Sequence, residues 1–349
     1  MIVGNSHSRE WIMSIRETSP GKDPILVEKM IMALTLLEHL RLNGLQFTFK
    51  GGTSLLLLLD TPQRFSIDID ILLPNDTGLE TCFQRVIGQG AFQRVEENRR
   101  PGDLPKAHYK FFFNSVIQNK ESQVLLDILF EENPYPLVRD VDLASPLLFT
   151  EGTPTKVTCP TIECLLGDKL TAFAPHTTGI QLGVGKELEI AKQLFDIGIL
   201  FDAAQNIGLV GATFEKIVSH ELAYRKLHLT HLDVLKDILA TCFTVGMRGA
   251  IFQPEYSEML EGFKKMAAFV YSGNFTLDTA ILCASKAAFL SALLVKKKTY
   301  IPRFTNPGVI ATWNIVNPEY NKLNKLKKTS PEAFYYYFKA LEMLEHDQE

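Results

Sequence analysis

Cysteine is scarce in this sequence. Five are scattered over 349 residues, with no C-x-x-C pair among them. A disulfide framework or a zinc site built on cysteine pairs requires such clustering. We therefore expect all five thiols to be reduced core residues, as is typical of a cytoplasmic protein.

Long apolar runs and a strong charge imbalance are also missing. A run such as Leu55–Leu59 is far too short to cross a bilayer, and the first twenty residues lack the apolar core of a secretion signal. We therefore expect no membrane segment. The net charge of −4 does not mark the whole chain as a nucleic-acid binder, so any such surface must be local.

The length of 349 residues exceeds that of a typical single domain and favours two domains. Helical and strand patterns alternate in the first part, whereas the composition turns helical after a proline-rich stretch over 133–160. The expected fold class is α+β. We expect a domain over 1–155 with a mixed β-sheet flanked by helices, followed by an all-helical domain over 156–349.

Several elements of the first domain can be placed from local signals. Asp23-Pro24 is typical of a helix start, and Asn43-Gly44 of its end. A second, shorter helix is expected over 52–59, and a third over 78–88. Period-two patterns and turn signals predict strands over 45–49, 67–73, 91–96, 107–116 and 122–130.

The motif at the centre of this domain joins a glycine- and hydroxyl-rich turn to two neighbouring acids. The turn is KGGTS (50–54), and the acids lie in RFSIDID (64–70). In a strand, Asp68 and Asp70 point to the same face, where like charges repel and lose hydration. A divalent cation between them, with phosphates completing its shell, resolves this conflict. The alternative is a plain glycine turn with a solvated edge strand, which the flanking isoleucines disfavour.

A phosphate-holding turn followed by Asp-x-Asp in a strand resembles the DNA-polymerase-β-like nucleotidyltransferase superfamily. Within it, KGGTSL (50–55) and RFSIDIDI (64–71) resemble the AbiEii family of nucleotidyltransferase toxins. The resemblance implies that the first domain has the polymerase-β-like fold and that Asp68 and Asp70 bind Mg²⁺ or Mn²⁺. The residues expected to hold the nucleoside triphosphate are Lys50, Gly51, Gly52, Thr53, Ser54, Arg64 and Ser66.

A third carboxylate, Asp127, stands alone in the apolar run Val124–Phe130. A buried aspartate in such a run must be paired, hydrogen-bonded or metal-bound. The superfamily resemblance implies that it binds the second metal ion and orients the attacking hydroxyl. An ordinary aspartate on the open face of the sheet is the alternative.

Two stretches of the helical half resemble further AbiEii motifs: DKLTA (168–172) and KQLFDI (192–197). Lys169 is expected to neutralise the triphosphate as pyrophosphate leaves, and Asp196 to hold this lysine. Lys186 follows a glycine-rich loop and is either a phosphate ligand or a solvated side chain. His176 stands where the family often has a basic residue, so this loop departs from the family pattern.

The stretch 296–328 is rich in cations and aromatic rings. It favours RNA contact through phosphate attraction and base stacking, or else it is a solvated helix face with core aromatics. The residues concerned are Lys296, Lys297, Lys298, Arg303, Lys322, Lys325, Lys327 and Lys328, with Tyr300, Phe304, Trp313 and Tyr320.

The implied reaction is transfer of a nucleoside monophosphate from a nucleoside triphosphate to a hydroxyl, with release of pyrophosphate. The family resemblance implies a toxin of a type IV toxin–antitoxin system that acts on tRNA or another RNA, with a cognate antitoxin encoded nearby. An enzyme that modifies a small molecule or a protein hydroxyl, and a non-catalytic nucleotide-binding module, are the alternatives. The sequence specifies neither the preferred triphosphate, nor the acceptor, nor the oligomeric state.

Overall fold

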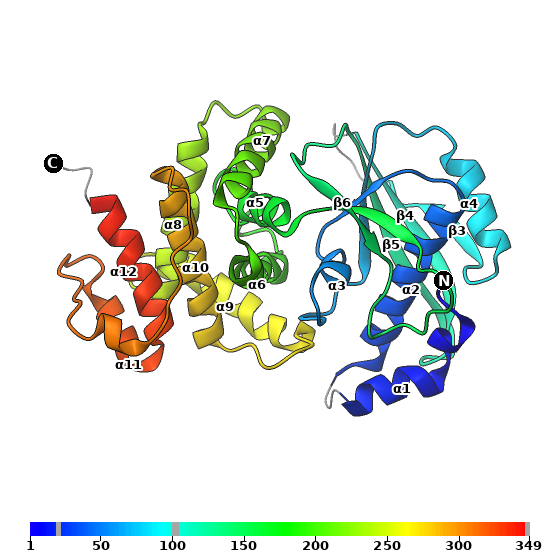
Figure 1. Cartoon of the computed structure of the whole chain (residues 1–349), viewed down its shortest axis with the longest axis horizontal. Coiled ribbons are helices and arrows are strands. Elements are labelled where there is room, and N and C mark those ends of the chain that lie inside the picture. Colours follow the sequence, from blue (N-terminus) through cyan, green and yellow to red (C-terminus); the bar gives the residue numbers. More distant parts are fainter. Residues whose placement is uncertain (19–21, 100–104, 346–349) are drawn as a thin grey trace. The chain divides into compact units, whose positions relative to one another are not determined.

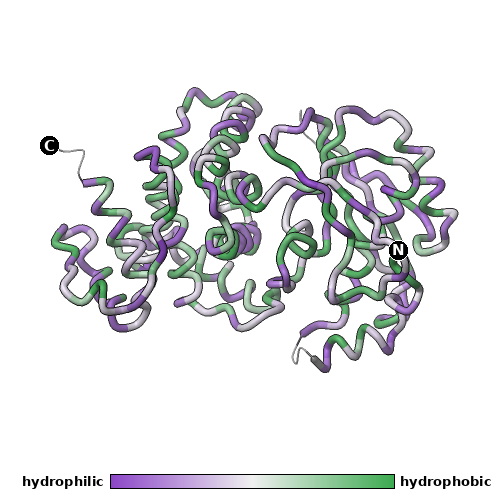
Figure 2. The backbone as a smooth tube through the Cα atoms, in the orientation of Figure 1, coloured by the Kyte–Doolittle hydropathy of each residue, from purple (hydrophilic) through white to green (hydrophobic). Residues whose placement is uncertain are grey.

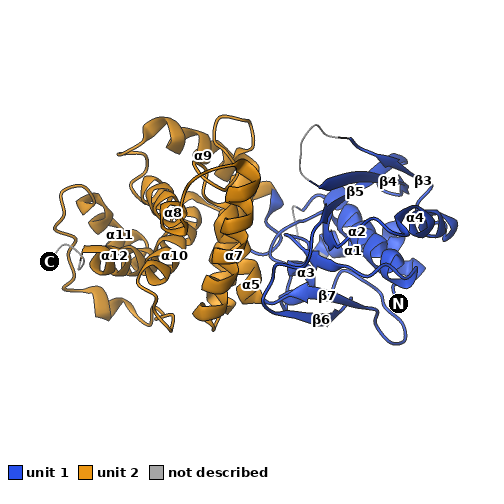
Figure 3. Ribbon diagram, turned by 90° about the horizontal axis from the view of Figure 1, so that it is seen from above, with its two compact units in different colours: residues 1–161, 269–273 blue, residues 162–268, 274–349 orange. Residues whose placement is uncertain are grey.

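The computed structural model describes residues 1–18, 22–99 and 105–345 (Figure 1). The chain divides into two compact units, coloured separately in Figure 3. Unit 1 contains Met1–Thr161 and Phe269–Gly273, and unit 2 contains Ile162–Ala268 and Asn274–Glu349. Unit 1 therefore extends past the boundary expected at 155/156, because the strand after that boundary belongs to its sheet. The return of residues 269–273 to unit 1 was not expected.

Within the described residues of unit 1, seven strands form one mixed sheet in the order β3-β4-β5-β2-β1-β7-β6. Strands β1 and β7 are parallel, as are β2 and β5, and the other neighbours are antiparallel. The predicted mixed sheet is confirmed. The strands are β1 (Thr48–Lys50), β2 (Asp68–Leu73), β3 (Arg94–Glu97), β4 (Lys106–Ser115), β5 (Lys120–Phe130), β6 (Val138–Asp142) and β7 (Lys156–Pro160).

The main helix of unit 1 is α2, which packs against β2 and β5. Its start is the predicted one, because the Asp23 side chain accepts a hydrogen bond from the Ile25 N–H (2.9 Å) and Pro24 occupies the first turn. The helix predicted over 52–59 is shorter, since residues 51–54 form a turn instead. The helical elements of unit 1 are η1 (Gly4–His7), α1 (Arg9–Thr18), α2 (Pro24–Leu42), α3 (Leu55–Leu58) and α4 (Leu79–Gly88).

The core of unit 1 lies between α2 and one face of the sheet. Ile69 and Ile71 of β2 and Leu126 and Ile128 of β5 are at most 1% exposed. Asp68 and Asp70 of β2 and Asp127 of β5, which alternate with these residues, are only half-buried. The alternation of hydrophobic and hydrophilic residues can be followed along the chain in Figure 2. One face of the central strands is therefore sealed by helices, whereas the other is left accessible.

Unit 2 is helical throughout its described residues, as expected. It contains α5 (Ile162–Ala172), α6 (Glu187–Ala203), α7 (Ile207–Arg225), α8 (His231–Gly246), α9 (Gln253–Met266), η2 (Ala267–Phe269, which ends in unit 1), α10 (Leu277–Val295), η3 (Pro307–Ile310), η4 (Asn321–Lys325), α11 (Leu326–Thr329) and α12 (Pro331–Glu345).

Helix α10 is the centre of unit 2 and packs against α6, α8 and α12. Among the described residues, it is the one helix long and apolar enough to span a membrane, yet 72% of its most apolar window is buried inside the protein. This burial is that of a core helix. All five cysteines are free and buried, which confirms the prediction of reduced core thiols.

Candidate active site

The acids predicted to act together lie on one face of the sheet. Asp70 on β2 is directly opposite Lys50 on β1 and Asp127 on β5. Directly opposite residues project to the same side of a sheet, and so do residues two apart along a strand, such as Asp68 and Asp70. The half-buried state of these side chains shows that this side is the accessible one. The predicted common face of Asp68 and Asp70 is confirmed, and Asp127 shares it.

The turn after β1 lies against this row of side chains. Gly51 has a φ of +77°, in the left-handed region that favours glycine. A Cβ atom at Gly51 would overlap the carboxylate of Asp70, and one at Gly52 would overlap the guanidinium of Arg64. The two glycines thus let the main chain approach β2 more closely than any other residue would.

The hydroxyl groups of the turn are used inside the protein. Thr53 is hydrogen-bonded to the Ser66 hydroxyl (2.8 Å) and to the main-chain carbonyl of Asp68, and Ser54 donates to the carbonyl of Gly51 (2.8 Å). Thr53 and Ser54 are fully buried. We therefore assign these two hydroxyls to the shape of the turn. Ser66, which is half-buried, and the main-chain N–H groups are the remaining candidates for phosphate binding.

Arg64 and Ser66 are fixed by a segment that sequence reasoning missed. Residues 269–273 return from unit 2 and pair with the chain just before β2: the Phe65 N–H donates to the carbonyl of Phe269 (2.7 Å), and the Tyr271 N–H to that of Gln63 (2.8 Å). Arg64 is only 6% exposed, and its Nη1 donates to the carbonyl of Phe65 (3.0 Å). Arg64 therefore helps to hold the turn as well as being a candidate phosphate ligand.

Asp127 is half-buried and hydrogen-bonded, and its partner is a histidine that the sequence did not single out. The Nδ1 atom of His108, directly opposite on β4, lies 2.6 Å from Oδ1 of Asp127. Strands β4 and β5 form a hairpin, and its register decides which residue lies opposite Asp127. The sequence did not predict this register. The strands predicted over 107–116 and 122–130 leave their pairing open, and in the structure they close at Ser115 and Lys120.

The chemistry of the three carboxylates suits a hard divalent cation such as Mg²⁺ or Mn²⁺, which prefers oxygen ligands. In the part of the chain that the structure describes, no group of three or more His, Cys, Asp and Glu side chains forms a ready-made metal cage. Magnesium sites of enzymes that act on nucleotides need no such cage, because one or two carboxylates and the substrate phosphates supply the ligands. The residues present therefore fit the ion as a site completed by substrate.

In unit 2, Lys169 of α5 and Asp196 of α6 form the predicted ion pair. The Nζ atom lies 3.0 Å from Oδ2, and the side chains are 8% and 0% exposed. Each of these buried charges needs the opposite charge beside it, because an isolated charge at such a site would strongly destabilise the folded protein. Sequence reasoning correctly joined these two residues, and their role in catalysis remains a prediction.

The loop before α6 has its own anchors. Lys186 is exposed at the start of α6, and the Gly183 N–H donates to the Glu258 carboxylate of α9 (2.7 and 2.8 Å). His176 lies between Asp237 (2.7 Å) and Glu255 (3.1 Å). Partial burial of the ring opposes protonation, but the hydrogen bonds and charges of these carboxylates outweigh it and raise the pKa of His176.

Most rings of the stretch 296–328 are half-buried and pack against other rings of unit 2. Trp313 stacks on Phe338 (centroids 4.6 Å apart) and on Tyr335 (5.6 Å), and Tyr320 packs on Phe243 (4.7 Å). Tyr300, which is 66% exposed, differs from these rings. Three of the four rings thus have ring partners inside the protein, whereas several of the lysines are exposed, and RNA contact by this stretch stays a prediction.

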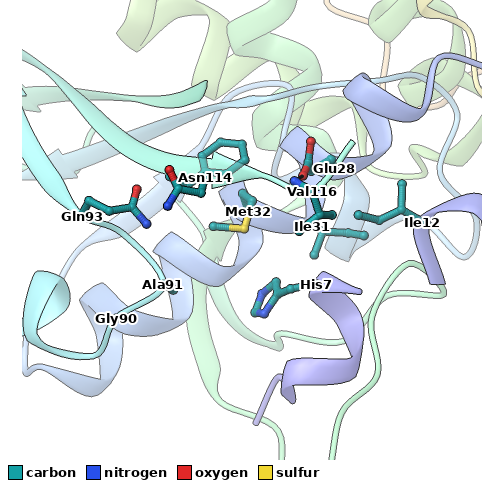
Figure 4. Close-up of a pocket in the computed structure, with 11 residues that line it drawn as sticks. His7, Ile12, Glu28, Ile31, Met32, Gly90, Ala91, Gln93, Asn114 and Val116 are labelled. Atoms are coloured by element: carbon teal, nitrogen blue, oxygen red, sulfur yellow. Dashed lines mark hydrogen bonds between the residues drawn. The ribbon is translucent and has the colours of Figure 1, made fainter. Parts of the chain in front are cut away.

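Unit 1 also has a pocket of about 180 Å³ on the helix-covered side of the sheet (Figure 4). His7 and Met32 face each other across it. Two polar groups at its wall have partners inside the protein: Glu28 accepts from the Ser115 hydroxyl (2.5 Å) and the Val116 N–H (2.6 Å), and His7 pairs with Thr35 (2.8 Å). This pocket is thus separate from the face that carries the acids.

Residues 35–268 match the protein family described as "Nucleotidyl transferase AbiEii toxin, Type IV TA system". Sequence comparison with curated proteins gives no match. Among solved structures, the JHP933 protein of Helicobacter pylori is 14% identical, with 85% of this chain and 96% of that chain covered and a TM-score of 0.47. A candidate nucleotidyltransferase from the same organism is 17% identical, with 78% and 97% covered and a TM-score of 0.48.

Proposed function

Because this chain belongs to the AbiEii family of nucleotidyltransferase toxins of type IV toxin–antitoxin systems, we propose that it transfers a nucleoside monophosphate from a nucleoside triphosphate to a hydroxyl acceptor and releases pyrophosphate. The observation that carries the proposal is the position of Asp70. It shares an accessible sheet face with Asp68 and Asp127 and lies against the glycine turn. Metal-binding oxygens and main-chain phosphate donors thus meet at one place.

In this reaction Asp68 and Asp70 bind Mg²⁺ or Mn²⁺ together with the triphosphate. When bound, the ion neutralises phosphate charge and makes the acceptor hydroxyl more acidic. Asp127 orients that hydroxyl for attack in line with the leaving pyrophosphate. Positioning and charge stabilisation of this kind supply most of the rate in phosphoryl transfer.

The turn supplies donors for the phosphates. Among the described residues, the N–H groups of Gly52 and Thr53 donate to no protein acceptor. Successive free N–H groups in a turn that contains a left-handed residue form a concave anion site. Ser66 adds a hydroxyl from the start of β2, and Lys50 and Arg64 add positive charge. Lys169, which is paired with Asp196, and Lys186 belong to unit 2, and their role as phosphate ligands stays a prediction.

RNA, and tRNA in particular, is the acceptor that we propose, in the cytoplasm and under the control of a cognate antitoxin. The family supports this choice, as do exposed lysines of the stretch 296–328, namely Lys297, Lys298, Lys322, Lys325 and Lys328. A small molecule or a protein hydroxyl is the alternative acceptor.

The test is to incubate the protein with Mg²⁺, total tRNA and each α-labelled nucleoside triphosphate in turn. Label in tRNA supports the proposal. Label confined to small molecules or to protein selects the alternative acceptor, and a protein that binds triphosphate but labels nothing is a non-catalytic module.

Asp70→Asn is expected to lower the labelling rate by about 10³-fold, since it removes a negative charge that binds the divalent cation. Asp142→Asn is the matched control, because Asp142 is an exposed aspartate of β6 in the same sheet. Equal rates for the two variants would contradict the assignment of Asp70.

A further inference from the structure

A histidine–aspartate pair lies at the edge of the row of acids. His108 and Asp127 are directly opposite on the antiparallel strands β4 and β5, and they continue the row Lys50–Asp70–Asp127 by one strand. The separation of 2.6 Å between Nδ1 and Oδ1 is that of a short hydrogen bond. Both side chains are shielded from solvent, with 15% and 29% of their surfaces exposed.

The chemistry of the two groups fixes which atom donates. An ionised carboxylate can only accept, so the proton of the hydrogen bond belongs on Nδ1 of His108. Each carboxylate has two oxygens, and this bond uses Oδ1. Among the described residues, no protein group is hydrogen-bonded to Oδ2 of Asp127. The histidine thus holds one oxygen of Asp127 and leaves the other available on the face that Asp68 and Asp70 share.

We propose that His108 is a positioning residue that orients Asp127, so that Oδ2 is presented to the divalent cation or to the acceptor hydroxyl. The proposal rests on the proposed nucleotidyl transfer, since it deepens the role of the same site. Outer partners that orient a metal-binding side chain act in this way: their loss weakens metal binding about 10–100-fold without removing a ligand.

The alternative is that the pair only keeps the sheet stable. Cross-strand pairs of opposite charge do stabilise sheets modestly. A merely stabilising pair would not change the affinity for metal once the protein is folded. Metal affinity, measured separately from stability and from turnover, therefore decides between the two roles.

The experiment compares three variants of the full chain. His108→Phe removes the donor and keeps a ring, whereas His108→Asn keeps an N–H donor close to the position of Nδ1. Asn114→Ala is the control on the same strand, away from the acids. Binding of Mn²⁺ is measured from the electron paramagnetic resonance signal of the free ion, with and without a non-hydrolysable triphosphate analogue. Circular dichroism checks that each variant is folded.

We expect His108→Phe to weaken Mn²⁺ binding about 10–100-fold, and His108→Asn and Asn114→Ala to stay within about threefold of the wild type. The Mg²⁺ concentration for half-maximal turnover should rise by the same factor in His108→Phe, with turnover recovered at high Mg²⁺. In an Asp127→Asn background, His108→Phe should add no further loss.

Unchanged Mn²⁺ binding in folded His108→Phe would overturn the inference and leave the proposed function standing, as would an equal loss in His108→Asn. A wild type that binds no Mn²⁺ even with the triphosphate analogue would instead overturn the proposed metal-dependent function itself. The two failures are therefore distinguishable in one series of measurements.

Discussion

Gly51 lies directly against the carboxylate of Asp70, so that a single methyl group on the glycine would overlap Oδ2. The turn and the acid strand are thus in contact at a point where no side chain fits. Glycine here serves two needs at once: the left-handed backbone with φ of +77°, and the close approach to an acidic side chain.

This contact predicts that Gly51→Ala abolishes nucleotide transfer by displacing Asp70. Gly78→Ala is the matched control, because Gly78 has nearly the same φ, +80°, but open space where its Cβ would lie. Both substitutions should cost about 1–2 kcal/mol in backbone strain. Thermal unfolding should therefore show a loss of stability in both variants, while turnover should fall only in Gly51→Ala. Equal turnover in the two would show that the contact does not matter to the site.

Because Lys169 and Asp196 form a buried ion pair, we predict that removing one of the two charges destabilises the protein more than removing both. Lys169→Met removes the cation from a carboxylate that has no exposed surface, so the free energy of unfolding should fall by about 3–5 kcal/mol. The double variant Lys169→Met/Asp196→Leu removes both charges and should recover much of that stability in urea unfolding.

Turnover separates the structural role of Lys169 from its proposed catalytic role. If the lysine neutralises the triphosphate, the stable double variant should remain inactive. A double variant that regains both stability and turnover would assign the pair to folding alone. Lys286→Met is a control, because this buried lysine of α10 also forms an ion pair, with Asp202 (2.7 Å), and is not among the predicted site residues.

His176 predicts a pH-dependent contribution to stability. Its pKa is raised by Asp237 and Glu255, against the effect of partial burial. A raised pKa in the folded protein means that the stabilisation is fully present below the unfolded value, about 6.5. It is then lost as the pH rises through the folded pKa.

The stability difference between the wild type and His176→Gln should therefore be largest near about pH 6 and should vanish at alkaline pH. Urea unfolding at a series of pH values measures it. His228→Gln, at an exposed histidine, is the control. A difference independent of pH would show that the ring contributes through packing and not through its charge.

We predict that the five cysteine thiols are alkylated slowly in the folded protein. Burial raises the pKa of Cys159 and of Cys283 to about 12, and that of Cys82 to about 11. Because the thiolate is the reactive form, iodoacetamide at about pH 8 should label none of the five thiols in the native protein and all of them in urea. Mass spectrometry counts the adducts. Rapid labelling of a native thiol would contradict the burial described for it.

Local sequence signals were sufficient for the elements that depend on nearby residues. The start of α2 follows from the Asp23 cap and Pro24, and the common face of Asp68 and Asp70 follows from the two-residue period of a strand. The pairing of Lys169 with Asp196 followed from family motifs and was confirmed. The helix predicted over 52–59 was too long. Residues 51–54 form a turn instead, because Thr53 is hydrogen-bonded to Ser66 and Asp68, which lie farther along the chain.

The sequence by itself therefore determined which side chains share a face and where the turn and acids lie, because these depend on backbone periodicity over a few residues. Only the tertiary structure decided that His108 is the partner of Asp127 and that residues 269–273 pair with the chain before β2. A cross-strand partner depends on the register of the whole hairpin, where a small shift of the turn changes every pair. Residues 65 and 269 both belong to unit 1, but about two hundred residues separate them along the chain. Their contact depends on how the whole chain folds, so no local pattern predicts it.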